Sequence, residues 1–159
     1  EARRISNPDE RLMAILRAYV VPAFVSSSEG DGGGAEFTRM RAVLSAEGNP
    51  DARTIIADAF DETSRSFIQA LSECLPGASP DGLVWRSQFL LGALYYALIN
   101  PERVTRLSNG TVDGEDREAA VSQLVDASYA SFRSLAAPSA TAEPGYEAPH
   151  KNTQESIQT

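Results

Sequence analysis

The sequence predicts an all-α fold, a helical bundle of about five helices, and three observations support this prediction. Apolar residues recur at helical spacing in five segments of the chain. Capping sequences that contain proline precede three of these segments, and no segment shows sustained alternation of apolar and polar residues. The chain has 159 residues, of which 42% are hydrophobic, so it can form one domain with one sizeable core.

The first part of the chain predicts two helices. The first, Pro8–Val25, begins after Asn7, because asparagine caps a helix and proline suits its first position. Pro22 lies inside this segment and should bend the helix or end it early. Residues 26–34, SSSEGDGGG, contain no apolar side chain and predict a flexible surface loop. Apolar residues over 37–44 then predict a short second helix.

The middle of the chain predicts two long helices. Asn49-Pro50 precedes the first, Ala52–Cys74, whose apolar side chains form one continuous stripe. Leu75-Pro76-Gly77 ends this helix. Ser79-Pro80 then begins the second, Pro80–Asn100, with the same capping chemistry.

The last predicted helix follows a polar, turn-rich segment over 102–114. Asp113 is expected to cap this helix, and its apolar face runs from Val121 to Leu135. Residues 138–159 consist mainly of small and polar residues and proline. Such a composition cannot bury enough apolar area to offset the entropy of ordering, so this segment is predicted to be a disordered tail.

The helix Pro80–Asn100 is apolar on nearly all sides, and a helix without a polar face must be covered all round. Either it is the centre of a single bundle, or a second subunit covers it. The last helix favours the second arrangement, because small residues flank its apolar seam and permit close helix packing. We therefore predict a homodimer with a four-helix interface formed by the last two long helices. The predicted interface residues are Leu91, Tyr95, Leu98, Val121, Leu124, Ser128 and Phe132.

The charge balance is acidic, with 14 lysine and arginine residues against 22 aspartate and glutamate residues, a formal net charge of −8. A nucleic-acid surface needs clustered basic residues, so DNA binding by this segment alone is not expected. The single cysteine, Cys74, forms no internal disulfide, which favours a reducing, cytoplasmic location. No apolar run reaches the roughly 18 residues of a membrane span, so no membrane association is expected.

Several motifs between Ala70 and Leu98, in this order, resemble the C-terminal region of tetracycline-repressor-like (TetR-family) bacterial transcription regulators. They are Leu75-Pro76-Gly77, Ser79-Pro80-Asp81, Leu83-Val84-Trp85-Arg86 and Phe89-Leu90-Leu91-Gly92-Ala93-Leu94. The resemblance implies that residues 1–137 form an effector-binding and dimerisation domain and that residues 1–5 end the helix joining it to a DNA-binding domain. Operator DNA would be bound only through an N-terminal helix-turn-helix domain, which is absent from this chain. The resemblance implies a regulator, by default a repressor. No cofactor is expected, because the sequence contains no cofactor motif.

A pocket for a small apolar or aromatic effector is expected between the middle helices, where large apolar side chains gather. For each of these residues, packing in the core is the alternative to ligand contact. Trp85 and Gln88 stand out, because each carries a polar group that needs a partner when buried. The predicted ligand-binding residues are Phe24, Met40, Leu44, Phe60, Phe67, Trp85, Gln88 and Phe89.

The sequence contains no pattern that indicates catalysis or metal binding. Cys74 lies near a helix C-terminus, where its thiol is expected to be buried filler, and the only histidine, His150, falls in the predicted tail. Asp61 and Arg65 are four residues apart and are expected to form a surface pair. The sequence therefore favours a regulator over an enzyme. The alternative is a non-regulatory helical interaction module or a carrier of apolar ligands.

Overall fold

The computed structural model of this protein describes residues 5–25 and 34–136. Within these residues the chain forms six α-helices and one short 3₁₀ helix, and no strand. The predicted all-α bundle is confirmed, with one α-helix more than expected. The elements are α1 (Pro8–Val20), η2 (Val21–Ala23), α2 (Gly34–Ala46), α3 (Pro50–Cys74), α4 (Pro80–Ile99), α5 (Glu102–Leu107) and α6 (Arg117–Ala136).

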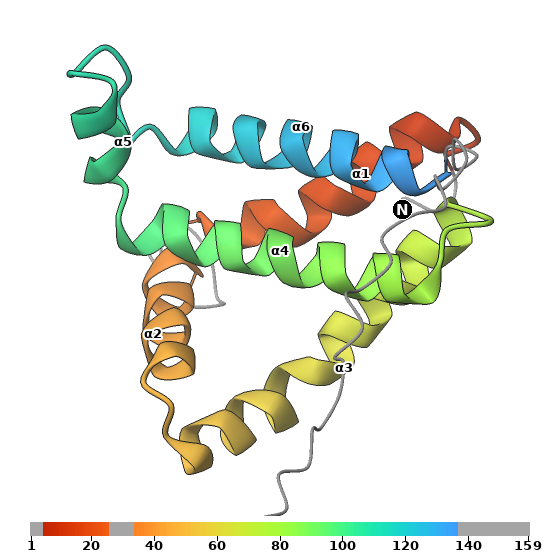
Figure 1. The fold of residues 1–159 in the computed structure, drawn as a ribbon, viewed down its shortest axis with the longest axis horizontal. Coiled ribbons are helices and arrows are strands. Elements are labelled where there is room, and N and C mark those ends of the chain that lie inside the picture. The colour runs from red at the N-terminus through yellow and green to blue at the C-terminus, as the bar shows by residue number, and fades with distance from the viewer. Residues whose placement is uncertain (1–4, 26–33, 137–159) are drawn as a thin grey trace, which may run out of the picture.

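The helices pack in two groups that share α4. α6 lies beside α1 and α4 and runs in the opposite direction to α4 (Figure 1). α3 packs against α1 and α4, while α2 packs against α3, α4 and η2. α2 and the first half of α3 converge on one another below α4 in Figure 1. As a result, α4 faces α6 on one side and α2 and α3 on another.

Local capping chemistry explains where three of the helices begin. The side-chain oxygen of Asn7 accepts a 2.9 Å hydrogen bond from the backbone amide of Asp9, and Asn49 accepts one of the same length from Asp51. The Ser79 hydroxyl accepts a 3.1 Å bond from the amide of Gly82. In each case proline follows the cap. The predicted starts of α1 and α4 are confirmed, and α3 begins at Pro50, two residues before the expected Ala52.

Three boundaries differ from the predictions or refine them. Pro22 ends the first α-helix early, and the chain continues as the 3₁₀ turn η2. The segment 102–107, expected to be a turn-rich connection, forms the short helix α5. Asp113 does not cap the last helix. Its carboxylate accepts a bond from the amide of Glu115 within the preceding turn, while Asp116 accepts from Ala119 and caps α6.

The core lies where α1, α3, α4 and α6 meet. Its largest fully buried side chains come from all four helices. Phe67 of α3 is in contact with aromatic rings on two sides, stacked on Tyr19 of α1 and edge-on to Phe132 of α6. Fully buried residues in this core are Leu12, Leu16, Val20, Leu71, Leu83, Leu94, Val125 and Phe132.

The prediction that α4 is covered on all sides does not hold within one subunit. One face is buried, carrying Leu83, Leu90 and Leu94, but the opposite face is open to solvent. Trp85 and Phe89 on that face are 62% and 64% exposed. The alternative in which α4 is the centre of a single bundle is therefore wrong, because no other described helix covers this face.

Some sequence predictions fall outside the residues that the structure describes. These are residues 1–4 of the expected inter-domain helix, most of the loop 26–34, and the segment 138–159 with its histidine, His150. Among the described helices, none is both long and apolar enough to cross a membrane.

Candidate functional site

A cavity of about 290 Å³ lies between α1, η2, α2, α3 and α4. Four segments of the chain, α1 with η2, α2, α3 and α4, form its walls, so the cavity exists only in the folded chain. α1 and η2 contribute one wall, α2 and the middle of α3 two more, and α4 the last. The lining residues are Ala18, Tyr19, Pro22, Ala23, Gly34, Phe37, Thr38, Arg41, Phe60, Thr63, Ser64, Leu91 and Leu94.

Arg41 gives this cavity its charge. Helical spacing puts Phe37 and Arg41 on the same face of α2, toward the cavity. The Arg41 guanidinium carbon lies 4.2 Å from the centroid of the Phe60 ring and 5.3 Å from that of Tyr95. Such cation–π contacts are worth on the order of 1 kcal/mol. The Nε of Arg41 is buried and has no hydrogen-bond partner among the described residues.

Hydroxyl groups provide the other polar atoms of the lining. Tyr19 is half-buried, and burial raises the pKa of its phenol, although the Arg41 charge and a side-chain hydrogen bond with Ser64 act in the opposite direction. The phenol therefore stays protonated at neutral pH and can donate a hydrogen bond. The Thr38 hydroxyl donates a 2.9 Å bond to the backbone carbonyl of Gly34. No aspartate or glutamate is among the lining residues described.

The structure brings only part of the predicted ligand set to this cavity. Phe60 lines it, but Phe67 is a core residue stacked on Tyr19. Phe24 is buried beside a separate shallow groove between the end of the first helix and α6. Met40 is 51% exposed, and Leu44 is half-buried outside the residues that line the cavity. Large apolar side chains alone did not predict which face of each helix bounds the cavity.

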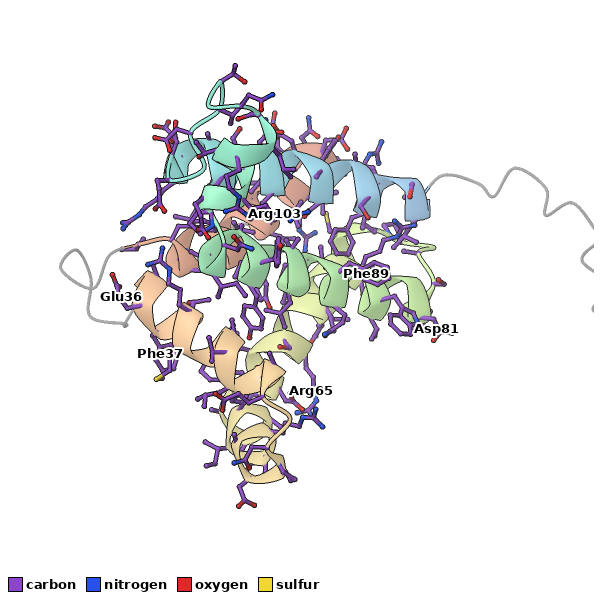
Figure 2. The ribbon with its side chains drawn as sticks, turned by 60° about the vertical axis from the view of Figure 1, so that its left-hand side comes forward. Glu36, Phe37, Arg65, Asp81, Phe89 and Arg103 are labelled. Atoms are coloured by element: carbon purple, nitrogen blue, oxygen red, sulfur yellow. The ribbon has the colours of Figure 1, made fainter. Side chains whose placement is uncertain are left out.

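Trp85, Gln88 and Phe89, also predicted to bind ligand, lie on the exposed face of α4, away from the cavity. The rings of Trp85 and Phe89 are 5.8 Å apart. Figure 2 shows Phe89 where α4 adjoins α6. The reason for singling out Trp85 and Gln88 does not hold, because neither side chain is buried and their polar groups need no internal partner.

The exposed face of α4 continues onto α6. A shallow groove of about 170 Å³ runs between the two helices, with Phe89 and Ala93 of α4 on one side and Ala127 and Ser131 of α6 on the other. Arg86 Nη1 donates a 2.7 Å hydrogen bond to the Ser131 hydroxyl and ties the helices together. This surface, which we call the α4–α6 face, combines large apolar side chains with small residues.

The residues predicted for a subunit interface are mostly not on the α4–α6 face. Leu98, Ser128 and Phe132 are buried within the subunit, although Ser128 and Phe132 line the groove between α4 and α6. Tyr95 is half-buried toward Arg41, and Leu91 lines the cavity.

The two remaining predicted interface residues are half-buried. Val121 lies in the shallow groove beside α1, whereas Leu124 lines the groove between α4 and α6. Of the two helices proposed for the interface, α4 keeps large exposed apolar residues, and Trp85, Phe89 and Tyr96 among them were not in the predicted set of interface residues.

The sequence-based prediction did not include Tyr19, Arg41 and Ser64, three of the polar residues that line the cavity. The predicted ligand set rests on apolar size, which does not single out hydroxyl and guanidinium groups. A usable signal was present for Arg41, since it follows Phe37 by four residues and therefore shares a helical face with an aromatic side chain. Ser64 carried no comparable signal.

The charged and sulfur-containing residues elsewhere have structural roles. Arg65 and Asp61 form the predicted surface pair, 3.4 Å apart. Cys74 is buried, as predicted, and its thiol lies 3.4 Å from the carbonyl oxygen of Pro8. Burial raises the pKa of this thiol. Within the described part of the chain, no group of three or more histidine, cysteine, aspartate or glutamate residues could hold a metal ion.

Comparison with known proteins identifies one family. Residues 17–130 match the family model described as "Tetracyclin repressor-like, C-terminal domain". This segment is more than half of the chain and contains the cavity and most of the α4–α6 face. No curated protein and no solved structure matches the chain significantly.

Proposed function

Because the chain belongs to the family of tetracyclin repressor-like C-terminal domains, we propose that it is the effector-sensing and dimerisation part of a transcription regulator. In this proposal the cavity binds a small, largely apolar or aromatic effector. The α4–α6 face pairs with the same face of a second copy. DNA binding is assigned to a helix-turn-helix domain N-terminal to these residues, since a chain with a net charge of −8 is poorly suited to contact phosphates itself.

The main support for this proposal is that α4 lines the cavity and also forms part of the α4–α6 face. Leu91 and Leu94 line the cavity, whereas Phe89 and Gly92, within two residues of Leu91, are exposed on the opposite side. A ligand that displaces α4 from inside must therefore disturb whatever packs against its outer face. This arrangement supports coupling between effector binding and the geometry of a dimer.

The composition of the α4–α6 face supports pairing with a second copy. Single exposed apolar residues are ordinary on protein surfaces, but here several large ones lie along one helix. A Cβ atom added at Gly92 would meet nothing within 4 Å, so another helix can approach closely there. Since two-fold dimers use the same patch on both subunits, one apolar face suffices for both. The exposed large residues of α4 are Val84, Trp85, Phe89, Tyr96 and Ile99.

The proposed regulator acts through the spacing of its two DNA-binding domains. Operator half-sites on one face of DNA lie about 34–36 Å apart or at multiples of this distance. An effector that favours a different spacing must weaken DNA binding, because coupling between two sites is reciprocal. We therefore propose a repressor released by its effector. A cytoplasmic location in a bacterium accompanies this role.

A native mass spectrum of the purified chain at micromolar concentration tests the proposal. The expected result is a dimer with twice the 17.1 kDa mass of one chain, with extra mass that mild activation removes when an effector has been retained. A monomer at this concentration would contradict the dimer. A dimer that takes up no small apolar compound from a panel of them would contradict the effector pocket.

A further inference from the structure

The cavity has an unusual charge for this protein. The chain as a whole is acidic, with a net charge of −8, yet the cavity has one guanidinium and no carboxylate among its described lining residues. Other arginines near the same helices have protein partners. Arg39 donates a 2.8 Å hydrogen bond to the backbone carbonyl of Leu98, and Arg65 pairs with Asp61. Arg41 thus differs from its neighbours.

The aromatic rings beside Arg41 do not satisfy its hydrogen-bonding groups. A guanidinium carries five N–H donors, and the faces of Phe60 and Tyr95 receive its charge without accepting a directed hydrogen bond. Its Nε is buried without a partner in the described chain. Arg41 is half-buried, and a partly buried guanidinium without an anionic partner gains charge-assisted hydrogen bonds from an anion that enters the cavity.

The arrangement of hydrogen-bond donors in the cavity favours one class of anion over others. The planar fork of a guanidinium matches the two oxygens of a carboxylate, and the Tyr19 and Ser64 hydroxyls lie in the same lining as further donors. A phosphate group carries up to two negative charges, whereas Arg41 is the only cation among the described lining residues. A singly charged carboxylate fits this set better.

The apolar walls of the cavity determine the size and polarity of the rest of the ligand. Pro22, Phe37, Phe60 and Leu91 present apolar surface to the cavity. The volume of about 290 Å³ is at the lower end of the roughly 300–1,000 Å³ typical of ligand sites. A compound with one or two rings, or a short alkyl chain, therefore fits.

We propose that the effector is a small amphipathic carboxylic acid, whose carboxylate is bound by Arg41 and whose apolar body packs between Phe60 and Leu91. This inference rests on the proposed function, since it assumes that the cavity is the effector site. It adds the charge of the ligand and the residue that recognises it. The acid enters as its anion, and no covalent step is involved.

Isothermal titration calorimetry with a matched pair of probes tests this inference. The pair is 2-naphthoate and 2-naphthamide, which have nearly the same shape but differ in charge. The wild-type chain should bind the acid at least about tenfold more tightly than the amide, because charge-assisted hydrogen bonds form only with the acid. Arg41→Gln should abolish this preference. Arg65→Gln removes the same charge from an exposed pair on α3 and should preserve it.

A third variant keeps the test interpretable if Arg41→Gln does not fold. Arg41→Lys retains the charge but not the planar fork, so its preference for the acid should lie between those of wild type and Arg41→Gln. Circular dichroism checks that each variant remains helical. If Arg41→Gln unfolds, the lysine variant still decides the question, since an undiminished preference would exclude recognition by the guanidinium fork.

The possible failures are distinguishable. If both probes bind equally well and Arg41→Gln changes neither affinity, the carboxylate inference is overturned while the effector cavity stands. Weak ligands have dissociation constants of about 1 mM. If neither probe binds the wild-type chain at about that concentration, the carboxylate inference is overturned, and the cavity also loses support as an effector site.

Discussion

The rings of Tyr19 and Phe67 stack with their centroids 4.1 Å apart and their planes inclined by 20°. Tyr19 lines the cavity, whereas Phe67 is buried in the core and meets Phe132 of α6 edge-on at 6.4 Å. Three aromatic rings therefore connect the cavity wall to one of the two helices of the α4–α6 face. Coupling between the two proposed sites has a packed route through these rings as well as through α4.

Removal of the central ring should destabilise the fold. Phe67→Ala deletes the side chain that both Tyr19 and Phe132 contact, and a loss of about 3–5 kcal/mol in the free energy of unfolding is expected. Phe67→Leu keeps most of the volume and should cost less. Urea denaturation followed by circular dichroism measures both values. Equal stability of the alanine variant and wild type would show that this contact is not part of the core.

A bulky side chain at the edge of the cavity should block ligand binding without unfolding the protein. Thr63 lines the cavity but is exposed, so Thr63→Trp can place an indole there at little cost to the core. The affinity for 2-naphthoate should fall at least about tenfold, since the indole fills space that the ligand needs.

Ser66→Trp provides the control for this experiment. Ser66 is exposed on the same helix but is not among the lining residues, so its variant should bind like wild type. Equal binding by the Thr63 and Ser66 variants would place the ligand somewhere other than this cavity.

A charge on the α4–α6 face should dissociate the proposed dimer. Phe89→Glu introduces a carboxylate where an apolar ring is 64% exposed, and burial of that charge against a second subunit is costly. The dissociation constant should rise at least about tenfold, measured by analytical ultracentrifugation.

The matched control for this change is Ile55→Glu. Ile55 is 69% exposed near the start of α3, apart from the α4–α6 face. This variant should keep the dissociation constant of wild type. The same dissociation in both variants would indicate a general effect of added acidity rather than a specific interface.

The buried thiol should make stability depend on pH in the alkaline range. Burial raises the pKa of Cys74 above its ordinary value of 9.0, with Arg11 and Arg133 acting against this and Asp9 adding to it. As pH rises through 9.0, the unfolded chain loses the thiol proton before the folded chain does, so the free energy of unfolding falls.

Cys74→Ala removes this contribution, and its unfolding free energy should therefore decline less steeply between about pH 8 and about pH 10. Urea denaturation at several pH values gives both slopes. Tyr19 also has a raised pKa, but it is present in both proteins and does not affect the comparison. Parallel slopes would show that the thiol ionises equally easily in the two states.

The sequence alone was sufficient to predict five of the six α-helices in the described residues and most of their starts. Asn7, Asn49 and Ser79 act on backbone amides within three residues, so their effect does not depend on the rest of the fold. Asp113 shows the limit of this reasoning. Two acidic residues stand close together before α6, and only the path of the preceding turn makes Asp116 the cap.

The tertiary structure decided which face of each helix is covered. On α4, apolar residues occur nearly all round, so periodicity could not separate the buried Leu90 from the exposed Phe89. The predicted interface therefore included Leu98 and Phe132, which the fold buries within the subunit.

The same physical reason explains the cavity. Tyr19, Arg41 and Ser64 come from three different helices, and only the packing of α1 and α2 against α3 puts their polar groups in one lining. Helix formation depends on neighbours along the chain, and the sequence determined it. The choice of buried faces depends on contacts between residues distant in sequence, and only the folded structure determined it.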